Sequence, residues 1–200
     1  MIFPLALCLG VIVAAAADTA AGINKTIVDL DIMAMANVSE TLVVVKRKHT
    51  TETKLRCHSA RKTGKMNETF YNYTLRAGYS NGAQYQYVEQ QVEVKLVPLR
   101  SGRGYRSKYT DRDGVRFSLR LRNMSEAGDC FVIMVNKTYT SGTVNMNSTR
   151  GCELLVPASK VTEEIPAECD TYYNETCKGD SLQLYQDDCI YDQVSSDPGC

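Results

Sequence analysis

The sequence predicts an all-β fold of about eight consecutive antiparallel strands, with a short helix near each end. Segments of alternating or β-branched residues follow one another at short spacing, and turn residues separate them. Runs of this kind are typical of a barrel or a sandwich. No internal repeat, low-complexity linker or change of composition marks a domain boundary. One domain is therefore expected over residues 18–200.

The expected elements follow from local pattern. Strand-like ranges are 41–48, 53–59, 69–79, 84–97, 115–122, 130–135 and 152–156, and range 100–113 is expected to form a hairpin arm and turn. Residues 24–37 fit a short amphipathic helix, 61–68 a polar loop and 182–191 a last extended piece. Pro166 suits the first turn of a helix that continues through residues 168–177.

A sequon for N-glycosylation at Asn72 indicates which face of the predicted strand at 69–79 is exposed to solvent. A glycan must point to solvent, and successive side chains of a strand point to opposite faces. Tyr71, Tyr73 and Leu75 are therefore expected on the buried face.

The predicted strand at 84–97 has candidate interior residues at both odd and even positions, which point to opposite faces of a regular strand. Tyr87 and Glu89 share one parity, whereas Val92 and Val94 share the other. A β-bulge between Glu89 and Gln91 would bring both sets to one side of the sheet.

Later strands supply further interior candidates. Residues 115–122 alternate between apolar side chains and arginine or serine, so Phe117 and Leu119 are expected on the dry face. Ile133, Val135 and Leu155 are inward candidates in the strands that follow.

The N-terminus predicts export. Residues 2–17 are almost wholly apolar and end in four alanines before Asp18, which is typical of a cleaved secretory signal sequence. This run of about 16 residues is shorter than the roughly 20 that a membrane-spanning helix needs. Removal of residues 1–17 takes away Cys8 and leaves seven of the eight cysteines. In an oxidising compartment, seven cysteines give three disulfides and either one remaining thiol or one intermolecular bond.

Glycosylation sequons support the same compartment. Eight of the ten asparagines lie in Asn-x-Ser/Thr sequons, far more than composition alone would give. The predicted glycosylation sites are Asn24, Asn37, Asn67, Asn72, Asn123, Asn136, Asn147 and Asn174.

Charge and motifs disfavour several classes of function. Lys plus Arg and Asp plus Glu both number 23, so no net field favours nucleic acid or an anionic membrane. The chain has only two histidines and no Gly-x-Ser-x-Gly or His-Glu-x-x-His motif, so no catalytic site is expected. The last four cysteines are too widely spaced for a structural zinc site. We therefore expect neither a cofactor nor a metal.

An ordered set of motifs resembles the tick salivary lipocalins, the family that includes histamine-binding proteins. The motifs are Cys57 in the second strand, Gly128-Asp129-Cys130 before an apolar run, Cys152-Glu153-Leu154, Ile165-Pro166-Ala167-Glu168-Cys169, and Cys189 near the end. The resemblance covers roughly residues 25–192. It implies an eight-stranded up-and-down barrel around a ligand cavity, with a C-terminal helix packed outside.

The same resemblance implies a disulfide pattern. Cys57 would pair with Cys189, and Cys130 with Cys169. Cys152 and Cys177 are then the suggested third pair, and Cys200 is left as the odd thiol.

Two ligand classes follow from the resemblance. Amine-binding members have an Asp after a strand cysteine and a Glu-Leu-Trp/Tyr triplet, whereas this chain has Phe131 and Leu155 at those positions. Glu89 and Glu153 match acidic positions of that group, and tyrosines could supply walls for histamine or serotonin.

The other class is a hydrophobic ligand such as a sterol, fatty acid or eicosanoid. The japanin-like branch, dendritic-cell modulators associated with sterol binding, looks similar in its Cys-Glu-Leu-Leu strand and extra cysteines. The candidate cavity residues are Tyr71, Tyr73, Leu75, Tyr87, Glu89, Phe117, Leu119, Ile133, Val135, Glu153 and Leu155.

A third hypothesis is a decoy that binds a host immune protein or cell through the barrel surface. The preferred prediction is a secreted salivary lipocalin that captures a small host mediator or lipid and dampens host defence.

Overall fold

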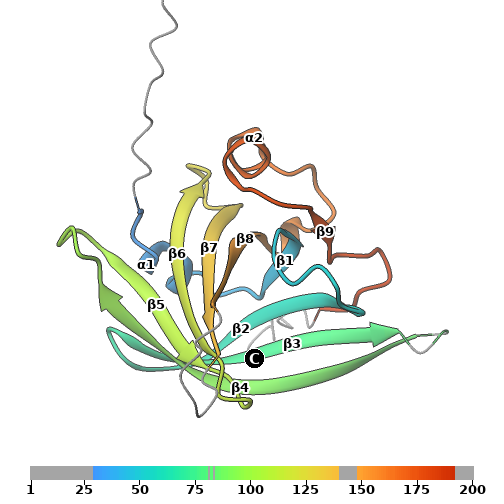
Figure 1. Ribbon diagram of the computed structural model, residues 1–200, viewed down its shortest axis with the longest axis horizontal. Coiled ribbons are helices and arrows are strands. Elements are labelled where there is room, and N and C mark those ends of the chain that lie inside the picture. Colours follow the sequence, from blue (N-terminus) through green and yellow to red (C-terminus); the bar gives the residue numbers. More distant parts are fainter. Residues whose placement is uncertain (1–28, 81, 83, 140–147, 192–200) are drawn as a thin grey trace, which may run out of the picture.

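The strands form one closed antiparallel barrel in the computed structural model, which describes residues 29–80, 82, 84–139 and 148–191 (Figure 1). Neighbouring strands pair in the order β2-β3-β4-β5-β6-β7-β8-β1, and β1 also pairs with β2 to close the ring. The strands are β1 (Leu42–Arg47), β2 (Leu55–Asn67), β3 (Phe70–Ser80), β4 (Tyr85–Pro98), β5 (Tyr105–Thr110), β6 (Arg116–Met124), β7 (Phe131–Thr138) and β8 (Ser148–Pro157). The predicted eight-stranded barrel is confirmed, and the sandwich is excluded.

Short helices lie at both ends of the described chain. They are α1 (Met33–Ala36), a 3₁₀ turn (Ala158–Lys160) and α2 (Ala167–Thr176). Within the described part of the range 24–37, only α1 is helical, and it packs Ile32, Met35 and Ala36 into the interior. No helix of the described residues is long and apolar enough to cross a membrane.

Strand β1 is apolar on both faces because it is covered from both sides. Leu42 and Val44 join the interior of the barrel, whereas Val45 packs outward beneath α2. The outer cluster contains Val45, Val132, Leu154, Val156 and Tyr173, together with four disulfide cysteines. A continuous run of apolar residues is what a strand buried on both faces requires.

Two sequence-based expectations about the long strands are wrong. The predicted loop at 61–68 is mostly strand, because β2 continues to Asn67 in a long ladder with β3. The predicted bulge in β4 does not form, since the β3–β4 register runs without a shift from Ser80↔Tyr85 to Phe70↔Lys95. The last extended piece contains only the two-residue strand β9 (Leu182–Gln183), which pairs with β1.

Three disulfides fasten the C-terminal part to the barrel. Cys130–Cys169 joins the start of β7 to α2, Cys152–Cys177 joins β8 to the end of α2, and Cys57–Cys189 joins β2 to the chain after β9. Cys57–Cys189 and Cys130–Cys169 are the pairs that the family resemblance implied, and Cys152–Cys177 is the third pair suggested once those two were assigned. Each such bond stabilises a fold by roughly 2–4 kcal/mol. Cys200 and the predicted signal sequence lie outside the described residues.

The end of β1 passes very close to β8 at Gly151. A Cβ atom at Gly151 would lie 2.4 Å from the Lys48 carbonyl oxygen and 2.7 Å from the His49 Cβ. The Lys48 amide donates to the Cys152 carbonyl at 2.8 Å, so the two backbones cannot separate without losing this hydrogen bond. Glycine is therefore required where the closing strand leaves the barrel wall.

We predict that Gly151→Ala lowers the free energy of unfolding by about 1–3 kcal/mol, since the methyl group must push backbone aside. Urea unfolding followed by circular dichroism measures the change. Gly64→Ala is the matched control, because the nearest atom to its Cβ would be 3.5 Å away. Equal stability of the two variants would contradict the proposed close approach.

Candidate ligand-binding site

A cavity of about 410 Å³ lies inside the barrel. Its apolar walls come from α1 and from strands on both sides of the closure, and exposed residues at its rim, such as Glu89, Arg112 and Asp113, show that it opens to solvent. The apolar and aromatic lining includes Ile32, Met35, Leu42, Val44, Tyr71, Tyr73, Leu75, Val94, Leu96, Phe117, Leu119, Ile133 and Leu155. This volume lies within the roughly 300–1,000 Å³ range of ligand pockets.

A charged cluster borders the same cavity. We call it the polar end and define it as Arg47, His58, Tyr109, Lys137 and Glu153, all of which line the cavity. It joins residues from β1, β2, β5, β7 and β8, so its geometry depends on closure of the whole barrel.

A register shift in β1 places Arg47 inside. Val44 pairs with Leu155, but Lys46 pairs with Leu154 and Arg47 with Glu153, so one extra residue lies between Val44 and Lys46. Such a bulge reverses which side chains point inward. Arg47 therefore lies opposite Glu153 on the cavity face, with 4% of its surface exposed.

The bulge directs Lys46 to the outside of the barrel. Its Nζ lies 2.6 Å from the Asp170 carboxylate on α2.

His49 holds the carboxylate of the polar end. Its Nε2 lies 2.9 Å from Glu153 Oε1, and because a carboxylate only accepts, the ring N–H is the donor. Burial would raise the pKa of Glu153, but the hydrogen bond and electrostatic interaction with His49, together with the positive charges of Arg47 and Lys137, lower it below its ordinary value. Glu153 is therefore an ionised and already paired carboxylate at neutral pH.

Not every hydrogen-bond donor of the polar end has an acceptor among the described residues. Arg47 donates from one terminal nitrogen to the Thr50 carbonyl at 2.8 Å, and Lys137 Nζ lies 3.3 Å from Thr50 Oγ1. The buried Nε of Arg47 and Nε2 of His58 have no hydrogen-bond partner among the described residues. The Nε–H of Arg47 can only donate, and an orphaned buried donor costs about 1–3 kcal/mol, so it favours an acceptor on a bound molecule; Nε2 of neutral His58 donates or accepts according to its tautomer.

Burial lowers the pKa of Arg47 and of Lys137, with Glu153 acting in the opposite direction. Both groups have ordinary pKa values far above neutrality, so their cationic forms persist.

Aromatic rings adjoin the polar end. Tyr109 and Phe117 are stacked, with ring centroids 4.5 Å apart and planes 6° from parallel, and Lys137 Nζ lies 5.3 Å from the Phe117 centroid. Burial raises the pKa of Tyr109, and it raises the pKa of Tyr73 to about 12. Both phenols are therefore neutral walls at physiological pH.

The structure brings together most of the predicted cavity residues. The wall contains Tyr71, Tyr73, Leu75, Phe117, Leu119, Ile133, Glu153 and Leu155. Val135 is buried in the interior cluster but is not part of the wall.

Two residues of β4 differ from expectation because the strand has no bulge. Tyr87 lies outside the cavity, where its hydroxyl accepts a hydrogen bond from the Ile190 amide at 2.8 Å and its ring lies 3.7 Å from the Arg76 guanidinium. Glu89 borders the cavity, but its side chain is 52% exposed and it pairs with Arg76 at 3.3 Å. The two acids of the amine hypothesis therefore do not converge on one unpaired site.

Sequence reasoning missed four charged or titratable members of this region. Lys137 continues the inward parity of Ile133 and Val135, and that signal could have found it. The inward position of Arg47 depends on the bulge in β1, and no local sequence pattern predicts that bulge. His49 and His58 belong to no catalytic motif, and their neighbours in this region are distant in the chain, so local sequence gives no signal for them.

The predicted glycosylation sites differ in their surroundings. Asn37, Asn67, Asn136 and Asn174 are exposed, and Asn72 is half-buried on the strand face opposite the cavity. The Asn123 amide already donates to the Glu168 carbonyl at 2.6 Å. Asn24 and Asn147 lie outside the described residues, and use of all eight sites stays a prediction.

We predict that His58 makes stability depend on pH. Burial, followed by the charge of Arg47, lowers its pKa from 6.5 to about 4, while Glu153 acts in the opposite direction and Lys137 and His49 reinforce the lowering. Between these values the unfolded chain binds more protons than the folded one, so stability falls as pH falls through this window. The full loss is about 3 kcal/mol.

The measurement is urea unfolding of wild type and His58→Gln from pH 7 to pH 4. The difference between the two pH profiles of stability isolates His58, because His49 is present in both proteins. The pKa of Glu153 is lowered, so the stability that its ionised form contributes is lost only below the ordinary pKa of a glutamate. The variant should lose less stability than wild type on acidification. Parallel pH profiles would show that His58 does not titrate as a buried group.

Comparisons with known proteins agree with this architecture. A family model described as tick histamine binding protein matches residues 31–191. The structure is similar to that of japanin from Rhipicephalus appendiculatus bound to cholesterol, with a TM-score of 0.52, 13% sequence identity, and coverage of 74% of this chain and 92% of that one. At this identity the likeness shows a shared fold. No curated protein sequence matches the chain significantly. The match over most of its length shows that the chain belongs to the tick histamine-binding protein family.

Proposed function

We propose that this protein is a secreted salivary lipocalin that sequesters a small hydrophobic lipid with an acidic head group. The observation that carries the proposal is the pairing of an apolar cavity with a polar end that holds the cations Arg47 and Lys137, the Nε–H of Arg47 having no acceptor among the described residues. The hydrocarbon part would lie against the apolar walls, and a carboxylate would lie near Arg47 and Lys137. Fatty acids and eicosanoids have this chemistry.

The apolar walls can supply useful affinity. Each buried methylene contributes about 0.8 kcal/mol, so ten would contribute roughly 8 kcal/mol before ordering costs. A charge-assisted hydrogen bond at the head group adds about 1.5–3 kcal/mol. Together these terms are compatible with micromolar or tighter binding.

The charges of the polar end disfavour a protonated amine. Glu153 already accepts a hydrogen bond from His49, and Arg47 and Lys137 both act on its pKa as positive charges. A second cation there would meet like charge in a site of low dielectric. Histamine or serotonin therefore fits this chain less well than an anion.

The comparisons support a ligand-carrying role without fixing the ligand. Japanin holds cholesterol in its structure, so a related fold accommodates a hydrophobic molecule. A sterol would place one hydroxyl where a fatty acid places two carboxylate oxygens, and it would leave more of the donors unused. We infer that removal of a lipid mediator at the feeding site would dampen the host immune or inflammatory response.

We predict tighter binding of arachidonic acid than of its methyl ester. Lys137→Gln should weaken binding of the acid about tenfold, because it removes a charge-assisted contact, and should leave the ester nearly unchanged. Displacement of a fluorescent fatty acid from the secreted protein measures both affinities. Lys178→Gln is the matched control, since Lys178 is exposed and distant from the cavity wall.

The same assay includes cholesterol and histamine. Equal affinity for acid and ester, unaffected by Lys137→Gln, would refute the acidic head group. Histamine binding that Glu153→Gln abolishes would favour the amine scavenger. Failure of every small molecule, with an empty barrel in native mass spectrometry, would favour the surface decoy.

A further inference from the structure

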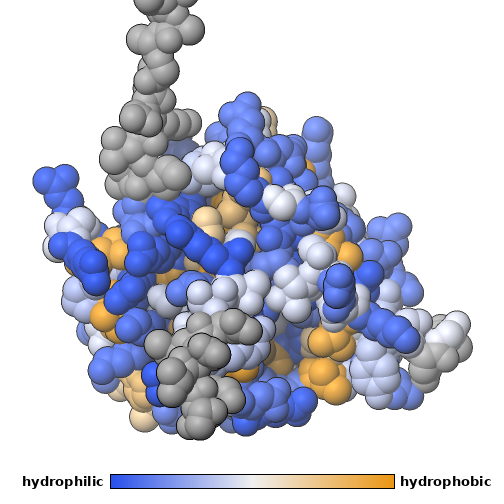
Figure 2. Space-filling model, viewed as in Figure 1, coloured by the Kyte–Doolittle hydropathy of each residue, from blue (hydrophilic) through white to orange (hydrophobic). Residues whose placement is uncertain are grey.

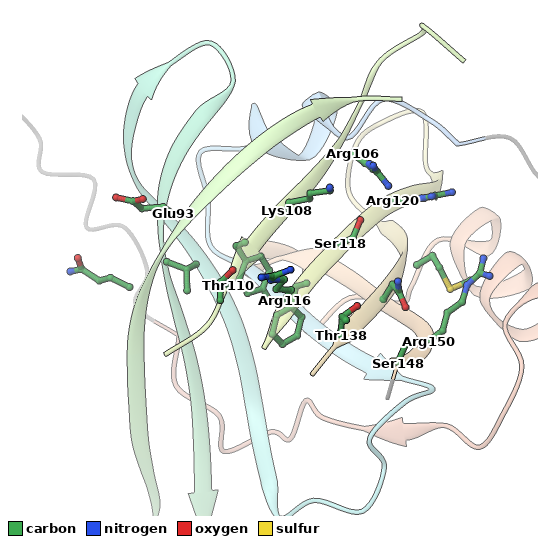
Figure 3. A pocket seen from close by; sticks show the side chains of 16 residues that line it. Glu93, Arg106, Lys108, Thr110, Arg116, Ser118, Arg120, Thr138, Ser148 and Arg150 are labelled. Carbon is green, nitrogen blue, oxygen red and sulfur yellow. The ribbon is translucent and has the colours of Figure 1, made fainter. Parts of the chain in front are cut away.

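A second depression, of about 1050 Å³, lies on the outer side of the barrel over β4–β8 (Figure 3). Its polar lining residues on β6 and β7 alternate in sequence with the residues that face the internal cavity. Ser118 lies between Phe117 and Leu119, and Asn136 lies next to Lys137. We call this depression the outer groove; Tyr109 and Phe117 line both it and the internal cavity, whereas its polar and charged residues do not line the cavity.

The outer groove is strongly basic. Its lining includes the cations Arg106, Lys108, Arg116, Arg120 and Arg150, against the single carboxylate of Glu93. Figure 3 shows these cations distributed across the strands, with Ser118, Thr138 and Ser148 between them. The chain as a whole has equal numbers of acidic and basic residues, so this concentration of charge is local.

Most of these cations form no ion pair with the residues that the structure describes. Arg120 lies 3.2 Å from the Asp29 carboxylate, but no described carboxylate forms an ion pair with Arg106, Lys108, Arg116 or Arg150. Lys108, Arg116 and Arg150 are exposed. Their mutual repulsion is relieved when an anionic partner binds.

The strand register gives the outer groove an extended shape. Lys108 pairs with Ser118, Ser118 with Asn136 and Asn136 with Arg150, so the four residues form one row across four strands. With strands about 4.8 Å apart, Lys108 and Arg150 are separated by roughly 14 Å. Arg116 lies in the neighbouring row, beside Thr138.

This chemistry fits one class of partner best. Guanidinium groups bind tetrahedral oxyanions through two parallel hydrogen bonds, and serine and threonine hydroxyls can donate to sugar and sulfate oxygens. The lining also contains Val92, Tyr109, Phe117 and Met134, but the exposed side chains of Lys108, Arg116 and Arg150 are cationic, which favours a polyanion over the apolar contacts that dominate protein interfaces. The face seen in Figure 2 is mostly hydrophilic, with apolar side chains in small separate areas. A flat bilayer cannot follow a depression.

We propose that the outer groove binds a linear sulfated polysaccharide of the glycosaminoglycan type, chiefly through Lys108, Arg116 and Arg150. None of these three cations lines the internal cavity, so the form of the protein without a glycan on Asn136 can carry a small ligand while it is retained on extracellular matrix.

Asn136 regulates access to this site if its sequon is used. It lies in the middle of the row between Lys108 and Arg150, and a glycan attached there would occupy the groove. The glycan-free form is therefore the form expected to bind polyanions. Asn136→Gln provides that form whatever the occupancy of the natural site.

The test is binding of heparin to the secreted Asn136→Gln protein by surface plasmon resonance over a range of salt concentrations. Adding Arg116→Gln and Arg150→Gln should weaken binding about tenfold or more and reduce its salt dependence. Lys54→Gln with Arg61→Gln is the matched control, because it removes the same charge from exposed positions outside the groove.

An equal loss of heparin affinity in the two double variants would overturn the proposal, since it would show that binding depends on total charge and not on the groove. Absence of heparin binding by Asn136→Gln would also overturn it, as would binding to phosphatidylserine vesicles in place of heparin. Arachidonic acid binding should be the same in all of these variants, because none changes the internal cavity. Failure of the lipid proposal is thereby distinguishable from failure of this one.

Discussion

Strand β1 closes the barrel because it pairs with β8 along one edge and with β2 along the other. Its four apolar residues at 42–45 are buried, which anchors the closing strand to the interior and to the layer beneath α2. At the end of β1 the chain must pass within contact distance of Gly151. The disulfides Cys130–Cys169 and Cys152–Cys177 hold α2 over the outer face of this closure. The enclosed cavity depends on these contacts.

The closure also creates the polar end. The bulge in β1 turns Arg47 toward Glu153, and the following turn brings His49 within hydrogen-bond distance of the same carboxylate. Glu153 thus has a hydrogen-bond partner in the protein, whereas the buried Nε–H of Arg47 has none among the described residues. The family resemblance points to this glutamate as an amine-binding acid, but its surroundings favour a bound acceptor. The residues around this one carboxylate therefore determine which ligand group the polar end favours.

The fold could be predicted well from sequence because its main signals are local. The sequon at Asn72 indicated the inward face of Tyr71 and Tyr73, and alternation at 115–122 indicated that of Phe117 and Leu119. The missed features are not local. Residues 61–68 form strand through pairing with β3, β4 runs without the expected bulge, and Arg47 enters the cavity through a register shift. Long-range pairing decides all three, so no single segment carries the information.

The most direct measurement is a crystal structure of the secreted protein grown with arachidonic acid. The account predicts one lipid inside the barrel, with its chain against Tyr71, Leu96 and Ile133 and its carboxylate about 3 Å from Arg47 or Lys137 nitrogens. A lipid bound with its carboxylate at the α1 end would contradict the role of the polar end. A barrel interior filled by its own side chains would contradict the account as a whole.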